Sequence, residues 1–182
     1  MPNIIEAATS LIGSLVDHEP KPPLHVGEVM SCWFYMGILE EARAFETAGL
    51  NTTVHSDLRQ ALNDGVKLCQ KHIDKLSKFM MDEGIPLPET SPEKPKSEPN
   101  QIPFGVKATD TELSNGMSLK VAGAVIHCAQ SASQSIRNDV GMMFIEFQTE
   151  MMTYGVTLKT LMRKHGWLKV PPSFIPPGVP QN

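Results

Sequence analysis

The hydrophobic positions along four stretches of the chain recur every three or four residues. In the clearest stretch, 56–82, steps of four and three alternate through Leu58, Leu62, Gly65, Cys69, His72, Leu76 and Phe79. This heptad stripe predicts a helix that packs lengthwise against other helices. Similar stepping recurs over 26–48, 117–132 and 140–165, and no alternating pattern typical of strands stands out. The pattern therefore predicts an all-α protein with four long helices.

The fifteen prolines lie outside these stretches. Four fall within 2–23, six within 86–103 and five within 171–180. Because proline disrupts helix interiors, the proline-free blocks 24–85 and 104–170 are predicted to hold the helices. Each block divides at a short turn, at 50–53 and 137–139, so each is predicted to form an antiparallel hairpin. Ser56 is a candidate cap for the second helix, and Thr109 with Glu112 forms a capping-box pattern for the third.

The link between the hairpins decides the predicted topology. Its 25 residues, 84–108, are rich in proline and can extend by about 3.1 Å each. That reach covers the length of helices about 40 Å long, so the link can cross from one end to the other. Two antiparallel hairpins with one long crossover form a ferritin-like four-helix bundle. A disordered tether between the hairpins is the alternative.

We therefore expect a single domain over 1–182. Its predicted parts are an N-terminal amphipathic segment (1–23), a first hairpin (24–83), the crossover (84–108), a second hairpin (109–168) and an extended tail (169–182). The amphipathic segment carries Ile4, Ile5, Ala8, Leu11, Ile12 and Leu15, and we expect it to cover the bundle. We expect the tail to lie against the surface.

Composition narrows the classes of function. The net charge is −4, the pI is about 5.8, and no run of Lys and Arg occurs, which argues against nucleic acid and anionic membrane partners. No apolar run approaches the ~20 residues of a membrane helix, and no basic segment of a secretory signal opens the chain. The cysteines Cys32, Cys69 and Cys128 are widely spaced, which fits synthesis in a reducing cytoplasm better than a disulfide framework.

Several short motifs resemble a known family. They are Pro23-Leu24-His25-Val26-Gly27-Glu28-Val29 before Cys32-Trp33, His72-Ile73-Asp74-Lys75-Leu76, Glu83-Gly84-Ile85-Pro86-Leu87-Pro88, Arg137-Asn138-Asp139-Val140, Glu150, Gly166-Trp167-Leu168 and Pro171-Pro172. Together they resemble an uncharacterised ferritin-like family of endospore-forming Firmicutes, some members of which are labelled "putative spore coat protein". The resemblance covers most of 24–172. It implies the fold, a bacterial origin and a role in sporulation with spore coat proteins as partners, but no reaction.

A di-iron site would require Glu-x-x-His pairs, and the chain has none. Cys69 stands three residues before His72, and Thr153 stands three residues after Glu150. A different set of metal-binding side chains could still converge in the core. If the second and third helices run parallel, these side chains lie at the same height along the bundle. A single zinc or iron ion could then be held by His72, Cys69, His127, Cys128 and Glu150. The competing interpretation is that the cysteines are buried as small apolar residues and the histidines bind neighbouring polar groups.

Two functional hypotheses follow. The first is a non-catalytic structural or interaction protein without a cofactor, associated with the spore coat. The second is a metal-binding bundle. Neither a phosphate-binding loop nor a serine nucleophile motif is present, so we do not expect an enzyme. The pairs Met80-Met81, Met142-Met143 and Met151-Met152 each place one methionine outside the apolar stripe, and we expect a homodimer.

Overall fold

The structure is a computed structural model that describes residues 3–6, 9–10, 21–90, 92, 94–174 and 176–177. Its long helices are α2 (Val26–Leu50), α3 (Ser56–Asp82), α4 (Asp110–Gln134) and α5 (Asn138–Lys164). A short 3-10 helix, η1 (Pro99–Gln101), lies in the link between α3 and α4. The described residues contain no strand, so the predicted all-α class is confirmed. Within those residues, no helix is long and apolar enough to cross a membrane.

The helix ends mostly follow the predicted capping residues. Thr109 accepts a hydrogen bond from the Glu112 amide, and Glu112 accepts one from the Thr109 amide, which confirms the capping box. The prediction for Ser56 is wrong, because Ser56 is the first helical residue and His55 occupies the cap position without a side-chain cap bond. At the other end of α3, Gly84 adopts a φ of 71°, which a side chain would oppose and which lets the chain leave the helix.

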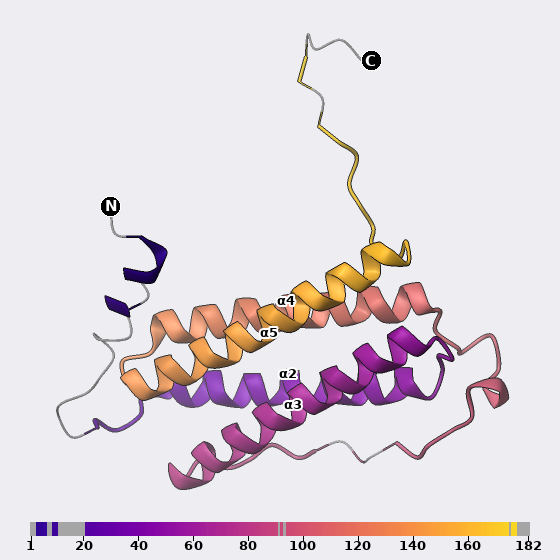
Figure 1. The fold of residues 1–182 in the computed structure, drawn as a ribbon. Coiled ribbons are helices and arrows are strands. Elements are labelled where there is room, and N and C mark those ends of the chain that lie inside the picture. The colour runs from indigo at the N-terminus through magenta and orange to yellow at the C-terminus, as the bar shows by residue number, and fades with distance from the viewer. Residues whose placement is uncertain are drawn as a thin grey trace.

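Figure 1 shows two antiparallel hairpins, α2 with α3 and α4 with α5, lying side by side. The chain returns along the length of the helices between α3 and α4, so that α3 and α4 run in the same direction. This return segment is attached to α2 near both ends. The Trp33 indole donates to the Pro86 carbonyl at 2.9 Å, while Asn51 donates to the Pro95 carbonyl at 2.9 Å and accepts from the Ser97 amide at 3.1 Å.

The core consists of two apolar clusters along the helix axes. The larger cluster surrounds Tyr35, Leu76 and Phe144, and the smaller one is formed by Leu58, Leu62, Leu113, Met117, Leu158 and Met162. Most of these residues come from the predicted stripes. Of each predicted methionine pair, one member is buried, namely Met80, Met143 and Met151. Met81 and Met152 are exposed.

The two ends of the chain match the predictions only in part. In the N-terminal segment, Ile4 and Ile5 are exposed, whereas Ala8, Leu11, Ile12 and Leu15 lie outside the described residues. After α5, residues 169–174 have no regular secondary structure and their path leaves the helices (Figure 1). Phe174 is 84% exposed, so the prediction that the tail lies against the surface is wrong for this part. Proline-rich backbone without apolar contacts gains nothing by packing there.

The hairpins are joined at one end by the buried guanidinium of Arg137, in the turn between α4 and α5. It donates to both carboxylate oxygens of Glu83, at 2.8 and 2.6 Å, and to both oxygens of Asp139, at 3.0 and 2.8 Å. Glu28, itself buried in the first turn of α2, accepts from the amides of Ile136 and Arg137 at 2.9 and 2.8 Å. One cluster thus connects α2, the end of α3 and the start of α5.

Replacing Arg137→Met should lower the free energy of unfolding by about 3 kcal/mol, because it leaves Glu83 without its cation and Asp139 with only the exposed Lys21. Urea denaturation followed by circular dichroism measures the change. Lys164→Met is the control. It removes an exposed ion pair with Asp57, so it should lower the free energy of unfolding far less than Arg137→Met does. Equal effects of the two substitutions would contradict a special role for Arg137.

Candidate functional site

The five predicted site residues lie in the middle of the molecule, but they contact different partners instead of forming one site. His72 and Glu150 are brought together, while His127 and Cys128 gather around Tyr35 of α2. Cys69, one helical turn before His72, faces Glu46 of α2 instead. The candidate site is therefore a buried polar layer built on Tyr35 and Glu46, two residues that the sequence analysis did not select.

His72 lies at the centre of this layer. Its side chain is 1% exposed, and its Nδ1 and Nε2 atoms lie 3.0 Å from the Tyr35 hydroxyl and 3.0 Å from Glu150 Oε2. Burial lowers the pKa of His72, although the Glu150 carboxylate opposes that shift. A neutral imidazole fits both contacts if Nε2–H donates to Glu150 and Nδ1 accepts the Tyr35 proton.

Glu150 is held by two partners on α3. Besides His72, the Lys71 ammonium donates to Glu150 Oε1 at 2.6 Å. Burial tends to raise the pKa of Glu150, but the hydrogen bonds from Lys71 and His72 outweigh it and lower the pKa overall. An ionised carboxylate that accepts from both residues orients the imidazole and ties α5 to α3.

Tyr35 is fully buried and connects the helices around it. Its ring stacks on His127 at a centroid distance of 5.8 Å and packs edge-on against Phe144. Burial is the main reason that the pKa of Tyr35 is raised far above its ordinary value, and the neighbouring Cys128 thiol adds to the shift. Tyr35 therefore stays a neutral phenol that donates one hydrogen bond to His72.

His127 makes a structural contact between α4 and α2. Its Nε2 atom lies 2.9 Å from the carbonyl oxygen of Ser31, and that carbonyl can only accept, so Nε2 carries a proton. The Ser131 hydroxyl lies 3.3 Å from the same nitrogen. This nitrogen is consequently occupied by the backbone of α2.

Glu46 forms the second part of the layer. It is 3% exposed, and the Cys69 thiol donates to its Oε2 atom at 3.8 Å. Burial raises the pKa of Glu46 to about 8, although the Cys69 hydrogen bond and Lys120 act in the opposite direction. A Cβ atom at Gly65 would come within 2.4 Å of Glu46 Oε1, so the glycine in the stripe of α3 makes room for this side chain.

The arrangement does not fit the predicted zinc or iron ligand set. Among the described residues, no group of three or more His, Cys, Asp and Glu side chains is arranged to hold a metal ion. Burial also raises the pKa of the Cys128 thiol to about 12 and that of Cys69 further, which opposes the thiolate form that binds metals. The five side chains bind mainly protein partners that differ from one to the next, rather than converging on one point.

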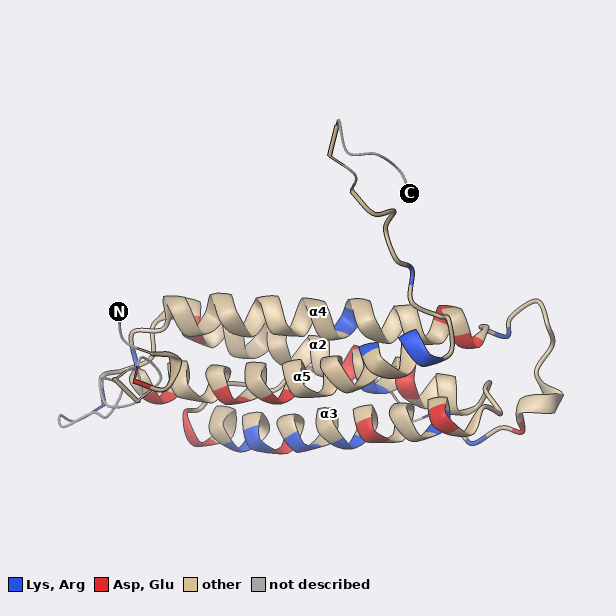
Figure 2. Ribbon diagram, turned by 45° about the horizontal axis from the view of Figure 1, so that its top comes forward, with Lys and Arg blue, Asp and Glu red and all other residues tan. Residues whose placement is uncertain are grey.

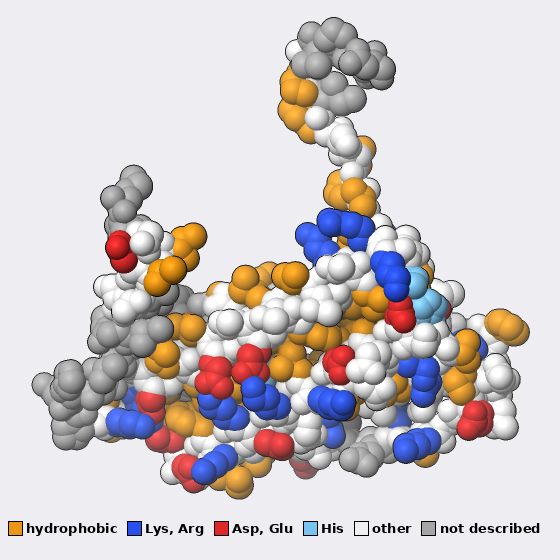
Figure 3. Space-filling view, viewed as in Figure 1, with side chains coloured by type: hydrophobic (Ala, Val, Ile, Leu, Met, Phe, Trp, Pro, Cys, Tyr) orange, Lys and Arg blue, Asp and Glu red, His pale blue; other side chains and the backbone are white. Residues whose placement is uncertain are grey.

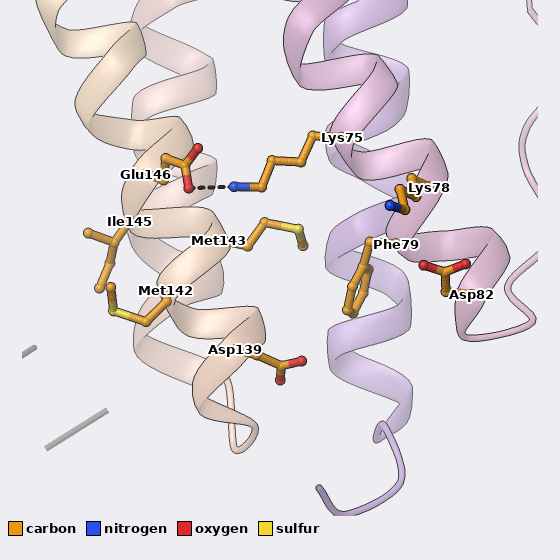
Figure 4. Close-up of a pocket in the computed structure, with 9 residues that line it drawn as sticks. All are labelled: Lys75, Lys78, Phe79, Asp82, Asp139, Met142, Met143, Ile145 and Glu146. Carbon is orange, nitrogen blue, oxygen red and sulfur yellow. Dashed lines mark hydrogen bonds and ion pairs between the residues drawn. The ribbon is translucent and has the colours of Figure 1, made fainter. Parts of the chain in front are cut away.

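A separate groove lies at the surface between the end of α3 and the start of α5 (Figure 4). Lys75 reaches across it to form an ion pair with Glu146. The lining consists of Lys75, Lys78, Phe79, Asp82, Asp139, Met142, Met143, Ile145 and Glu146. None of the predicted site residues belongs to it, so the candidate site and this groove are distinct.

Three comparisons relate the chain to known proteins. The model of a family described as "Protein of unknown function (DUF3231)" matches residues 15–179. The uncharacterized protein YvdQ of Bacillus subtilis (strain 168) is 30% identical over 161 residues, which span 88% of this chain and 95% of YvdQ.

Two solved structures are similar. The crystal structure of a "putative spore coat protein" from Bacillus halodurans C-125 has a TM-score of 0.83 at 30% identity and covers 85% of this chain and 98% of its own. A DUF305 fragment from Deinococcus radiodurans has a TM-score of 0.64 at 15% identity and covers 79% of this chain and 99% of its own. The second likeness concerns the fold alone.

A double-mutant cycle tests the contact between Tyr35 and His72. His72→Leu should cost about 1–2 kcal/mol of unfolding free energy, because it leaves the buried Tyr35 hydroxyl without an acceptor. Tyr35→Phe should lower the unfolding free energy less in the His72→Leu variant than in the wild-type protein. The expected difference between the two losses, which is the coupling energy, is about 1 kcal/mol. Tyr154→Phe is the matched control, because its hydroxyl donates to the Ala61 carbonyl instead. Additive losses for Tyr35 and His72 would refute the contact.

Glu46 predicts a pH dependence of stability. Its pKa is about 8 in the folded protein and near 4.5 in an ordinary environment, so folding favours the protonated form. The stability that Glu46 provides is full below about pH 4.5 and declines as the pH rises to about 8, by at most about 1.4 kcal/mol per pH unit. Glu46→Gln should remove this decline. Urea denaturation from pH 5 to 8 measures it, and parallel curves for the two proteins would contradict it.

Proposed function

Since the chain belongs to the DUF3231 family of proteins of unknown function, we propose that it is a non-catalytic structural or interaction protein of the bacterial spore coat. The observation that carries the proposal is the buried polar layer. Its reactive groups are 0–3% exposed at Tyr35, His72, Cys128 and Glu46, and they bind one another or the backbone. Side chains used in this way hold helices in place and do not present themselves to a substrate.

The relative from Bacillus halodurans supports the coat assignment, because it is similar over 85% of this chain and is described as a putative spore coat protein. We propose that this chain is synthesised in the cytoplasm and then joins the coat with other coat proteins. The helix directions and the long return segment support a ferritin-like relationship, which we include in the proposal.

We propose further that the chain acts as a homodimer. Exposed large apolar side chains are numerous on its long helices and include Met30, Phe34, Leu119, Ile126 and Val156. Such surface normally becomes buried in assemblies. Contacts between identical surfaces close at the dimer, so a dimer of this kind would join a coat through its remaining surfaces.

The metal-binding hypothesis remains the second proposal for the chain, and no specific observation favours it over the first. Both ring nitrogens of His72 already have partners, and the Nε2 atom of His127 binds the backbone. Plasma mass spectrometry of untagged protein after growth with added metal would support it if about one zinc or iron per chain were found.

The coat assignment predicts where the protein is found in an endospore-forming host that encodes it. An antibody against the chain should detect it in the detergent- and alkali-extracted coat fraction of purified spores. It should be depleted from the spore core, and a cytoplasmic enzyme serves as the fractionation control. Recovery of the chain only with that enzyme, both in growing cells and in spores, would contradict the proposed function.

A further inference from the structure

The outward side of α2 carries a row of exposed apolar residues. Val26, Met30, Phe34 and Gly37 follow one another at steps of four, four and three, which places them on one side of the helix. Val26 is 85%, Met30 51% and Phe34 57% exposed. Trp33 flanks the row, and its indole is fixed by its hydrogen bond to Pro86.

A matching row lies on α4. Leu119, Gly123 and Ile126 share one side of that helix, and Leu119 and Ile126 are 75% and 66% exposed. A shallow depression joins the two rows. It is lined by Trp33, Phe34, Gly37, Ile38, Glu41, Lys120 and Gly123. We call the surface made by these two rows the α2/α4 face.

Charge is almost absent from this face. In α2 from Val26 to Ile38 the single charged residue is Glu28, which is buried, and residues 121–136 contain no Asp, Glu, Lys or Arg. Glu41 and Lys120 mark one end of the face. Figure 2 shows the contrast, because α3 carries acidic and basic residues along its whole length whereas α4 is largely uncharged. In Figure 3 charged side chains gather over α3 and α5.

We propose that the α2/α4 face is the surface on which a second copy of this chain packs, as a two-fold symmetric dimer. The inference rests on the self-association included in the proposed function and assigns it to particular residues. In such a dimer each residue near the axis meets its own copy, so any charge there would repel itself. An uncharged face meets this requirement, and the mixed charges of α3 stay in solvent.

The shape and size of the face also fit a second copy. Apart from the backbone of its own helix and its chain neighbours, nothing lies within 4 Å of a Cβ built at Gly37 or at Gly123, so both glycines border open space into which an aromatic side chain of the other copy can pack. The face is two helices wide, and the uncharged part of α4, from 121 to its last residue, extends about 20 Å.

Cross-linking tests the geometry directly. Gly37→Cys and Gly123→Cys place a thiol on the face without a clash, and the native cysteines are all buried. A short bis-maleimide should convert each variant into a species of twice the 20.0 kDa chain mass. Asp74→Cys, on the exposed side of α3, is the matched control, and on a denaturing gel it should keep the mass of a single chain because its thiols lie away from the interface. Cross-linking of the control, but of neither glycine variant, would overturn the assignment.

Substitutions test the energetics by sedimentation equilibrium of the whole chain. Phe34→Lys and Ile126→Lys should each raise the dimer dissociation constant at least tenfold, because both copies then place a charge in the interface. Met81→Lys on α3 and Val156→Lys on α5 are exposed apolar controls that should leave it unchanged. Circular dichroism must show all four variants to be folded.

The possible failures are distinguishable. If the wild-type chain is a dimer, and Val156→Lys breaks it while Phe34→Lys leaves it intact, the assignment to the α2/α4 face is wrong. The self-association in the proposed function would still stand. A wild-type chain that sediments at 20.0 kDa at every concentration would overturn both.

Discussion

The buried guanidinium of Arg137 is the interaction on which the pairing of the two hairpins most depends. A long proline-rich segment joins the hairpins and sets neither their angle nor their register. Contacts between the hairpins must therefore supply both. Arg137 does so at one end, since its guanidinium donates four hydrogen bonds to Glu83 at the end of α3 and Asp139 of α5. Glu28 of α2 accepts from the adjacent backbone amides. At the other end, Asp57 of α3 binds Lys164, the last residue of α5, and His165, which follows it.

The polar layer has the same role in the middle of the molecule. An apolar layer there would be at least as stable, but it would tolerate a slip of one helix along another. A one-turn slip would separate Tyr35 from His72 and Cys69 from Glu46, and each buried polar group would then lose its partner. The layer therefore selects one register of α2 against α3 and of α3 against α5. This explanation accounts for histidine, tyrosine and glutamate in a core without requiring a reaction.

The sequence predicted the helices well because helix length and turn position depend on local patterns. The predicted turn at 50–53 overlaps the observed one at 51–55, and the Thr109 capping box is present. The turn predicted at 137–139 lies at 135–137 instead, because Asn138 and Asp139 already belong to α5. Counting residues along the helices placed His72 and Glu150 at one level, but as two of five ligands of a metal ion rather than as partners of each other. Tyr35 and Glu46 were missed because their burial depends on how the hairpins are rotated against each other. Periodicity gives the apolar side of a helix, but it does not reveal which polar residue at its edge finds a partner across the core.

The central claim is that His72 is a neutral structural residue held between Tyr35 and Glu150. Nitrogen-15 NMR of the histidine side chains measures this most directly, because the shifts of Nδ1 and Nε2 report the tautomer and charge. We expect His72 to be neutral with its proton on Nε2 at neutral pH and to titrate below its ordinary pKa, and we expect one equivalent of zinc to leave its shifts unchanged. Titration of His72 near its ordinary pKa, or a shift of its nitrogens on adding zinc, would contradict the account.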